Sequence, residues 1–163
     1  MGFKFGRAAA CAVAGVVVAN AALAHDVGPV PNTPAGKAAA ARHENYKQVG
    51  GAFKAISDQA RTGSPDKAVV LANAQKLSTL AGQMPTWFPK GSGTESGVKT
   101  DAKPEIWKDP QGFAAAIKRL QTESAKLQQV AATGDAAALK AQFQATGGAC
   151  KGCHDKFRVP DKD

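Results

Sequence analysis

The chain carries two cysteines and a histidine in the spacing Cys-x-x-Cys-His close to its C-terminus, at Cys150, Cys153 and His154. In a helix, residues three and four apart lie on one face, so both thiols lie on one side with the imidazole near the same stripe. This spacing is the attachment signature of a c-type haem. Each thiol can form a thioether with one haem vinyl group, and the imidazole can reach the iron. The motif therefore predicts a helix that carries one covalently bound haem c per chain.

Two other chemistries use a Cys-x-x-Cys pair and stay open as alternatives, namely a zinc site and a redox-active dithiol. A zinc site needs four ligands, and here only His154 with a distant His25 or His43 could complete the set. A thioredoxin-like dithiol belongs to a strand-helix-strand unit, and no part of the chain shows that pattern. We therefore favour haem.

The N-terminus has the features of a secretory signal peptide. Lys4 and Arg7 precede an apolar run over residues 8–19, and a small-x-small sequence ends at Ala24. Such a run is too short to span a bilayer comfortably, so we expect no stable membrane insertion, a retained anchor being the alternative. We expect residues 1–24 to be cleaved and the mature protein to be periplasmic in a bacterium.

Cleavage would remove Cys11 and leave residues 25–163 as a single domain whose cysteines are those of the motif. A structural disulfide is then impossible, although the compartment would permit one. The full chain has a net charge of +8, but its Lys and Arg residues are scattered and form no block. We therefore expect no nucleic-acid partner.

Four amphipathic segments follow one another along the mature chain, each begun by a capping residue and continued by apolar residues three or four apart. They span about 33–62, 64–84, 109–134 and 135–159. A loop rich in Pro and Gly, roughly residues 84–108, separates the second segment from the third, and we expect Trp87, Phe88 and Trp107 to fasten it to one end of the core. The other connections are short, which favours an all-α, antiparallel four-helix bundle.

A haem motif at the C-terminal end of a secreted four-helix chain resembles the class II c-type cytochromes, and specifically the cytochrome c′ family. Four segments carry this resemblance, which spans the whole mature chain. They are Arg42-x-x-x-Tyr46-Lys47 with Gly50 soon after, Gly-Thr-Glu-Ser-Gly at 93–97, Ala-Lys-Pro-Glu-Ile-Trp at 102–107, and Ala-Cys-Lys-Gly-Cys-His-Asp-Lys-Phe-Arg at 149–158.

The resemblance implies a role for each matching residue around the motif. Cys150 and Cys153 would hold the haem covalently, and His154 would be the proximal axial ligand of the iron. Arg158, one helical turn after the histidine, would lie near the proximal face of the iron.

Two residues of the first helix also match the family. Arg42 would pair with a haem propionate, a contact that suits the fork of a guanidinium, with a solvated surface arginine as the alternative. Tyr46 would cover the distal face of the haem.

The identity of residue 46 decides the expected coordination of the iron. Low-spin relatives place methionine at this position, where a thioether binds the sixth coordination site. A neutral phenol is a poor ligand opposite histidine. We therefore expect five-coordinate, high-spin iron in an apolar distal pocket lined by Tyr46, Val49, Gly50 and Phe53, and we expect Met84 to fill the core. His43 is the alternative ligand, one turn before Tyr46.

The resemblance implies two functions, one-electron transfer with redox partner proteins and binding of the diatomic gases NO and CO. A low-spin, six-coordinate protein that only carries electrons is the alternative. We expect no enzymatic activity, because no distal His and Arg pair is present for acid-base work on peroxide.

The family also pairs commonly as two-fold homodimers through the first two helices. In this chain these helices carry small or apolar residues beyond one core stripe, which supports a homodimer. These residues are Ala38, Ala40, Ala41, Ala52, Val69 and Ala72.

Overall fold

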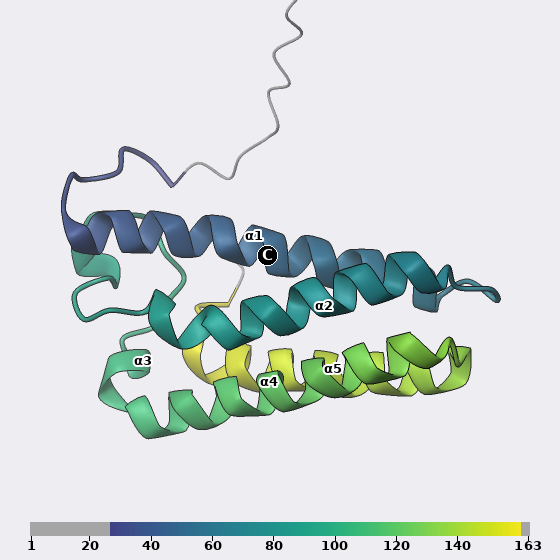
Figure 1. The fold of residues 1–163 in the computed structure, drawn as a ribbon. Helices are drawn as coiled ribbons and strands as arrows, with labels where there is room; N and C mark the ends of the chain where they lie inside the picture. Colours follow the sequence, from purple (N-terminus) through teal and green to yellow (C-terminus); the bar gives the residue numbers. More distant parts are fainter. Residues whose placement is uncertain (1–26, 161–163) are drawn as a thin grey trace, which may run out of the picture.

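The computed structural model describes residues 27–160, so the predicted signal peptide at 1–24 lies outside the described residues. Four long helices form the bundle: α1 (Pro34–Ala60), α2 (Lys67–Gln83), α4 (Pro110–Thr133) and α5 (Ala136–Phe157). Each runs antiparallel to the one before it, as Figure 1 shows. The predicted all-α, antiparallel four-helix bundle is confirmed.

Each long helix begins at a side chain that accepts hydrogen bonds from the first free backbone N–H groups. The capping residues are Thr33, Asp66, Asp109 and Asp135. Pro34 and Pro110 occupy the first helical turn, where a missing N–H costs nothing. Gly134 ends α4 with a φ of 81°, in the left-handed region that favours glycine.

The core lies along the inward stripes of the four helices, with Ile56, Leu77 and Leu127 fully buried. Ala52 is also in this core at 2 % exposure, so the expectation that it lies on an outer surface of α1 is wrong. Its spacing explains this result, because Ala52 lies three residues after Val49 and four before Ile56, which are both buried.

The long loop contains three short helical turns that sequence periodicity does not reveal, namely η1 (Met84–Trp87), η2 (Thr94–Ser96) and α3 (Glu105–Lys108). Its aromatic residues pack on one end of the core, as expected. The Trp107 Nε1–H donates to the Phe88 carbonyl at 3.2 Å, and the Phe88 ring lies edge-on to Phe113 of α4, with ring centres 4.8 Å apart.

This loop also pairs with the backbone at the end of α5. The Lys103 N–H donates to the Phe157 carbonyl at 3.0 Å, and the Val159 N–H donates to the Asp101 carbonyl at 2.8 Å. Between them, Ala102 and Arg158 form an isolated antiparallel bridge. The C-terminal end of α5 and the long loop are therefore joined at the same end of the bundle (Figure 1).

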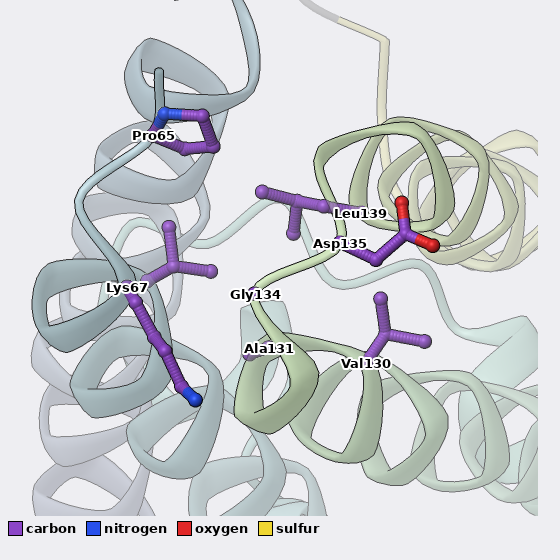
Figure 2. A pocket seen from close by; sticks show the side chains of 8 residues that line it. Pro65, Lys67, Val130, Ala131, Gly134, Asp135 and Leu139 are labelled. Carbon is purple, nitrogen blue, oxygen red and sulfur yellow. The ribbon is translucent and has the colours of Figure 1, made fainter.

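At the opposite end, a small cavity lies between the start of α2 and the α4–α5 turn (Figure 2). Lys67 and Leu139 are among the residues that line it, and its volume of about 10 Å³ is close to that of a single water probe. It is too small for an organic ligand. Within residues 27–160, no helix has the length and apolar character needed to cross a bilayer.

Candidate haem-binding site

The motif cysteines lie in the last two turns of α5, so the segment that carries the motif is helical, as its spacing predicts. Cys150 and Cys153 are half-buried and pack against the hydrophobic core, so both thiols lie on the inner side of the helix. Neither forms a disulfide. Two thiols on one side of one helical turn are the arrangement that two haem vinyl groups require.

Burial raises the pKa of both thiols. The pKa of Cys153 rises to about 11, with the neighbouring Cys150 as a second contribution, and that of Cys150 also rises above its ordinary value. Redox-active dithiols need the opposite shift, because the thiolate is the reactive species. The environment of this pair therefore argues against the redox dithiol that the motif alone left open.

Tyr46 of α1 lies across from these cysteines. Its ring packs edge-on against Trp87, with centres 5.4 Å apart, and against Phe88 at 6.3 Å. Burial raises the pKa of Tyr46 well above its ordinary value of 10, and the proximity of Cys153 raises it further. The structure thus places a neutral, packed phenol next to the motif cysteines. If the thiols form thioethers, they no longer contribute to the raised pKa of Tyr46, but the burial of the phenol still raises it.

Two turns further along α1 from Tyr46, Phe53 packs against Phe143 of α5. Their rings are stacked with centres 4.4 Å apart. Gly147, which follows on α5, lies against the Phe53 ring, and a Cβ there would be 3.4 Å from it, at the edge of ordinary van der Waals contact. Of the other predicted pocket residues, Val49 is buried and Gly50 is exposed.

Arg42 is buried at 3 % exposure, so it is not the solvated surface arginine considered as the alternative. Its Nη1 donates to the Trp87 carbonyl at 3.2 Å and to Ser92 Oγ at 2.9 Å. Its Nη2 donates to the Ser92 carbonyl at 2.7 Å and to Thr100 Oγ1 at 3.1 Å. The guanidinium also lies over the Phe88 ring, 4.7 Å from its centre.

These contacts make Arg42 the residue that anchors the long loop to α1, a role that sequence reasoning missed. The sequence does carry a signal for the burial of Arg42, though not for its partners, because Arg42 lies three residues after the buried Ala39 and seven before the buried Val49. A guanidinium has five N–H donors, and the contacts to the loop occupy both terminal nitrogens. The contact with a haem propionate stays a prediction that would have to use the remaining Nε–H.

His154 is exposed in the last turn of α5, one residue beyond Cys153. Its position leaves the imidazole accessible to a haem attached at the adjacent cysteines. Arg158 follows the end of the helix, and its Nη2 lies 3.6 Å from Asp101 Oδ2 in the long loop. The proximal roles of these two residues stay predictions. Met84 is 2 % exposed in the core, as expected for a residue that fills space there.

The residues at this end of the bundle fit a covalently bound haem. Two protonated thiols with the required spacing face the interior, an imidazole follows them directly, and a neutral phenol lies opposite. A helical bundle whose last helix bears such a motif defines a c-type cytochrome of the four-helix class.

Comparison with known proteins narrows this class. The family described as cytochrome C′ matches residues 37–158. Cytochrome c′ of Rubrivivax gelatinosus is 39 % identical over 118 residues, which cover 72 % of this chain and 90 % of the relative. The chain belongs to the cytochrome c′ family, whose members carry a covalently bound c-type haem.

Solved structures agree with this assignment. The crystal structure of the Rubrivivax gelatinosus protein matches with a TM-score of 0.70 and 37 % identity, covering 76 % of this chain and 96 % of that one. Cytochrome c′ of Thermochromatium tepidum matches with a TM-score of 0.74 and 26 % identity, covering 80 % of this chain and all of that one (100 %). A nitric oxide complex of a mutant cytochrome c′ from Alcaligenes xylosoxidans matches with a TM-score of 0.70 and 29 % identity, covering 77 % of this chain and 97 % of that one.

Proposed function

We propose that this chain is a periplasmic cytochrome c′ that transfers single electrons and binds NO and CO at a five-coordinate, high-spin haem iron. Cys150 and Cys153 hold the haem, His154 is its proximal ligand and Arg158 lies near the proximal face. When bound, the haem supplies a reversible one-electron couple and an open coordination position. The nitric oxide complexes of the Alcaligenes xylosoxidans relative support the gas-binding part of this proposal.

The observation that carries the proposal is the packed, neutral phenol of Tyr46 beside the attachment cysteines. Its ring is held edge-on between Trp87 and Phe88, so it cannot swing away without losing these contacts. Its raised pKa keeps the hydroxyl protonated at neutral pH, and a protonated phenol is a poor ligand for iron. Tyr46 therefore obstructs the distal side without coordinating there.

This arrangement predicts slow binding of carbon monoxide that becomes faster when the ring is removed. Displacing the ring exposes part of a buried aromatic side chain, which costs about 2 kcal/mol of free energy. Tyr46→Ala removes this cost from the barrier to binding and should raise the association rate roughly thirty-fold. Stopped-flow mixing of the ferrous protein with carbon monoxide measures this rate. Tyr46→Phe is the matched control, because it keeps the ring and removes only the hydroxyl, and it should leave the rate nearly unchanged.

The same variants test the alternative, a six-coordinate low-spin protein that only carries electrons. If the unmutated ferric protein has a low-spin spectrum and Tyr46→Ala leaves carbon monoxide binding unchanged, another side chain holds the sixth position and the proposal fails. Tyr46→Met should instead move the ferric spectrum toward low spin, because a thioether can bind the iron from this position. We propose no enzymatic activity.

We also propose that the protein is a homodimer paired through α1 and α2. Val69 on α2 is a large apolar residue that is 37 % exposed, and the small residues Ala41 and Ala72 are exposed on the same two helices. A cytochrome c′ with 26 % identity and a TM-score of 0.72 shows ligand-controlled dimer dissociation. Val69→Asp should shift the sedimentation coefficient at micromolar concentration toward that of a monomer. Val30→Asp, at a 44 % exposed position before α1, is the control.

A further inference from the structure

A surface cavity of about 240 Å³ lies within the long loop, and its lining includes none of the haem motif residues. An apolar cavity of about 150 Å³ can hold a benzene molecule, so this one has room for an aromatic or large aliphatic side chain. Ala102, Pro104 and Trp107 form the apolar part of its lining. Lys90 and Lys108 also line it, and both are exposed.

The free charges of this lining are positive. Within the part of the chain that the structure describes, neither Lys90 nor Lys108 forms an ion pair. Glu95 is the acidic residue of the lining, and its carboxylate lies against Gly93. Glu95 also interacts electrostatically with the buried guanidinium of Arg42, which balances its charge.

Most other acidic residues of the loop region are neutralised by partners. Asp101 lies 3.6 Å from Arg158, and Asp109 pairs with Lys156. Glu105 forms no such pair among the described residues, but it does not line the cavity. An acidic surface is therefore attracted to the cavity, whereas a basic one is not.

The cavity lies at the end of the bundle that carries the haem motif. Ala102 of its lining pairs with Arg158, which directly follows α5. The Trp107 ring lies edge-on to Phe88, with centres 6.3 Å apart, and Phe88 lies edge-on to Tyr46 at the same distance of 6.3 Å. A partner seated over Trp107 is therefore two ring contacts away from the phenol beside the motif cysteines.

We propose that the cavity beside Trp107 is the docking site of an acidic redox protein. This partner places one apolar side chain in the cavity and sets carboxylates against Lys90 and Lys108, since an apolar centre with a polar rim is the usual anatomy of a protein interface. The inference rests on the proposed function, because it names the partner class for its electron transfer. Transfer at this face moves one electron, lost by one redox centre and gained by the other, with no bond formed or broken and no proton moved.

Two synthetic peptides represent the partner surface, Glu-Glu-Phe-Glu-Glu and Glu-Glu-Ala-Glu-Glu. Isothermal titration calorimetry with the haem-loaded protein in about 0.15 M salt should show tighter binding of the peptide that contains phenylalanine. About 1 M salt should abolish this binding, because the Debye length then falls to about 3 Å. Ala102→Leu fills the cavity without changing any charge, so the two peptides should bind this variant alike.

A charge-reversed variant tests the rim at exposed positions that do not affect the core. Lys90→Glu combined with Lys108→Glu should weaken binding of the phenylalanine peptide about tenfold. Lys67→Glu combined with Lys140→Glu is the matched control, because it changes the net charge equally at exposed positions at the opposite end of the bundle. It should leave the affinity nearly unchanged.

Equal losses of affinity in the two double variants would show that only net charge matters, and would overturn the inference. Equal binding of both peptides to the unmutated protein would also overturn it, as would phenylacetate that binds as tightly as the phenylalanine peptide, because the cavity would then be a small-ligand site. Cyclic voltammetry separates the two proposals. A reversible one-electron wave without selective peptide binding overturns this inference alone, whereas the absence of any such wave overturns the proposed electron transfer and this inference with it.

Discussion

Replacing Arg42 by methionine removes the guanidinium that joins α1 to the long loop while keeping an unbranched apolar side chain. The Trp87 and Ser92 carbonyls then lose their donor in a buried place. Each such loss costs about 1–3 kcal/mol, and the contact with the Phe88 ring adds about 1 kcal/mol, whereas relief from burying a cation offsets part of the sum. We expect a net loss of about 3 kcal/mol in the free energy of unfolding.

Urea unfolding of the haem-loaded protein, followed by far-ultraviolet circular dichroism, measures this loss. Limited tryptic digestion adds a local readout, because Lys90 and Lys99 lie in the loop that Arg42 anchors and should be cut faster in the variant. Arg42→Lys keeps the charge but has a single nitrogen, which cannot span the same acceptors, so it should restore only part of the stability.

Arg61→Met is the matched control, an exposed arginine at the C-terminal end of the same helix, and should change the unfolding midpoint little. The reasoning is refuted if Arg42→Met unfolds at the same urea concentration as the unmutated protein and its loop is cut no faster. That result would mean that the loop is held by its aromatic contacts alone.

Three further predictions concern the motif and the helix ends. Replacing both Cys150 and Cys153 by alanine should abolish haem retention after acid-acetone extraction, and haem retained by the double variant would contradict the attachment assignment. Asp135→Ala should lower the free energy of unfolding by about 1 kcal/mol in urea titration, because two N–H groups of α5 lose their cap, whereas Asp135→Asn should stay close to the unmutated value. The pKa of Asp109 is held below its ordinary value by hydrogen bonds from Lys156 and the Gly112 N–H, so its stabilising effect is present above the ordinary carboxyl range and is lost as pH falls through the lowered pKa. Asp109→Asn should therefore flatten the acid side of the pH–stability curve, and a curve of unchanged slope would contradict this linkage.

The helices of the bundle could be predicted from sequence because their signals are local. Asp109 and Asp135 cap helices that begin at the next residue, and most of the apolar residues spaced three or four apart along α2 and α4 are buried, with Leu71 and Val130 only partly so. The short turns of the long loop carry no such signal. The η2 turn depends on the Ser96 hydroxyl, which donates to the Gly93 carbonyl at 2.6 Å, and on packing against the bundle.

The candidate site also combines features that a local pattern predicts with features that depend on how distant segments pack. The relation of Cys150 to Cys153 is a property of one helical turn and could be read from spacing. The position of Tyr46 opposite them came from the resemblance, because it depends on how α1 and α5 are aligned. The loop contacts of Arg42 and the cavity beside Trp107 depend on segments far apart in the chain, so no local pattern contains them.

The pairing between the long loop and the end of α5 has a consequence for the order in which the protein folds. The contact in which Lys103 Nζ donates to the Asp155 carbonyl joins residues 52 positions apart. Closing a flexible segment of that length costs about 3–4 kcal/mol of chain entropy, more than a few exposed hydrogen bonds return. The pairing therefore forms only after α4 and α5 have packed against each other and brought these ends together. The joining of the long loop to the end of α5 is thus a late step of folding, and it closes the end of the bundle at which Cys150 and Cys153 lie.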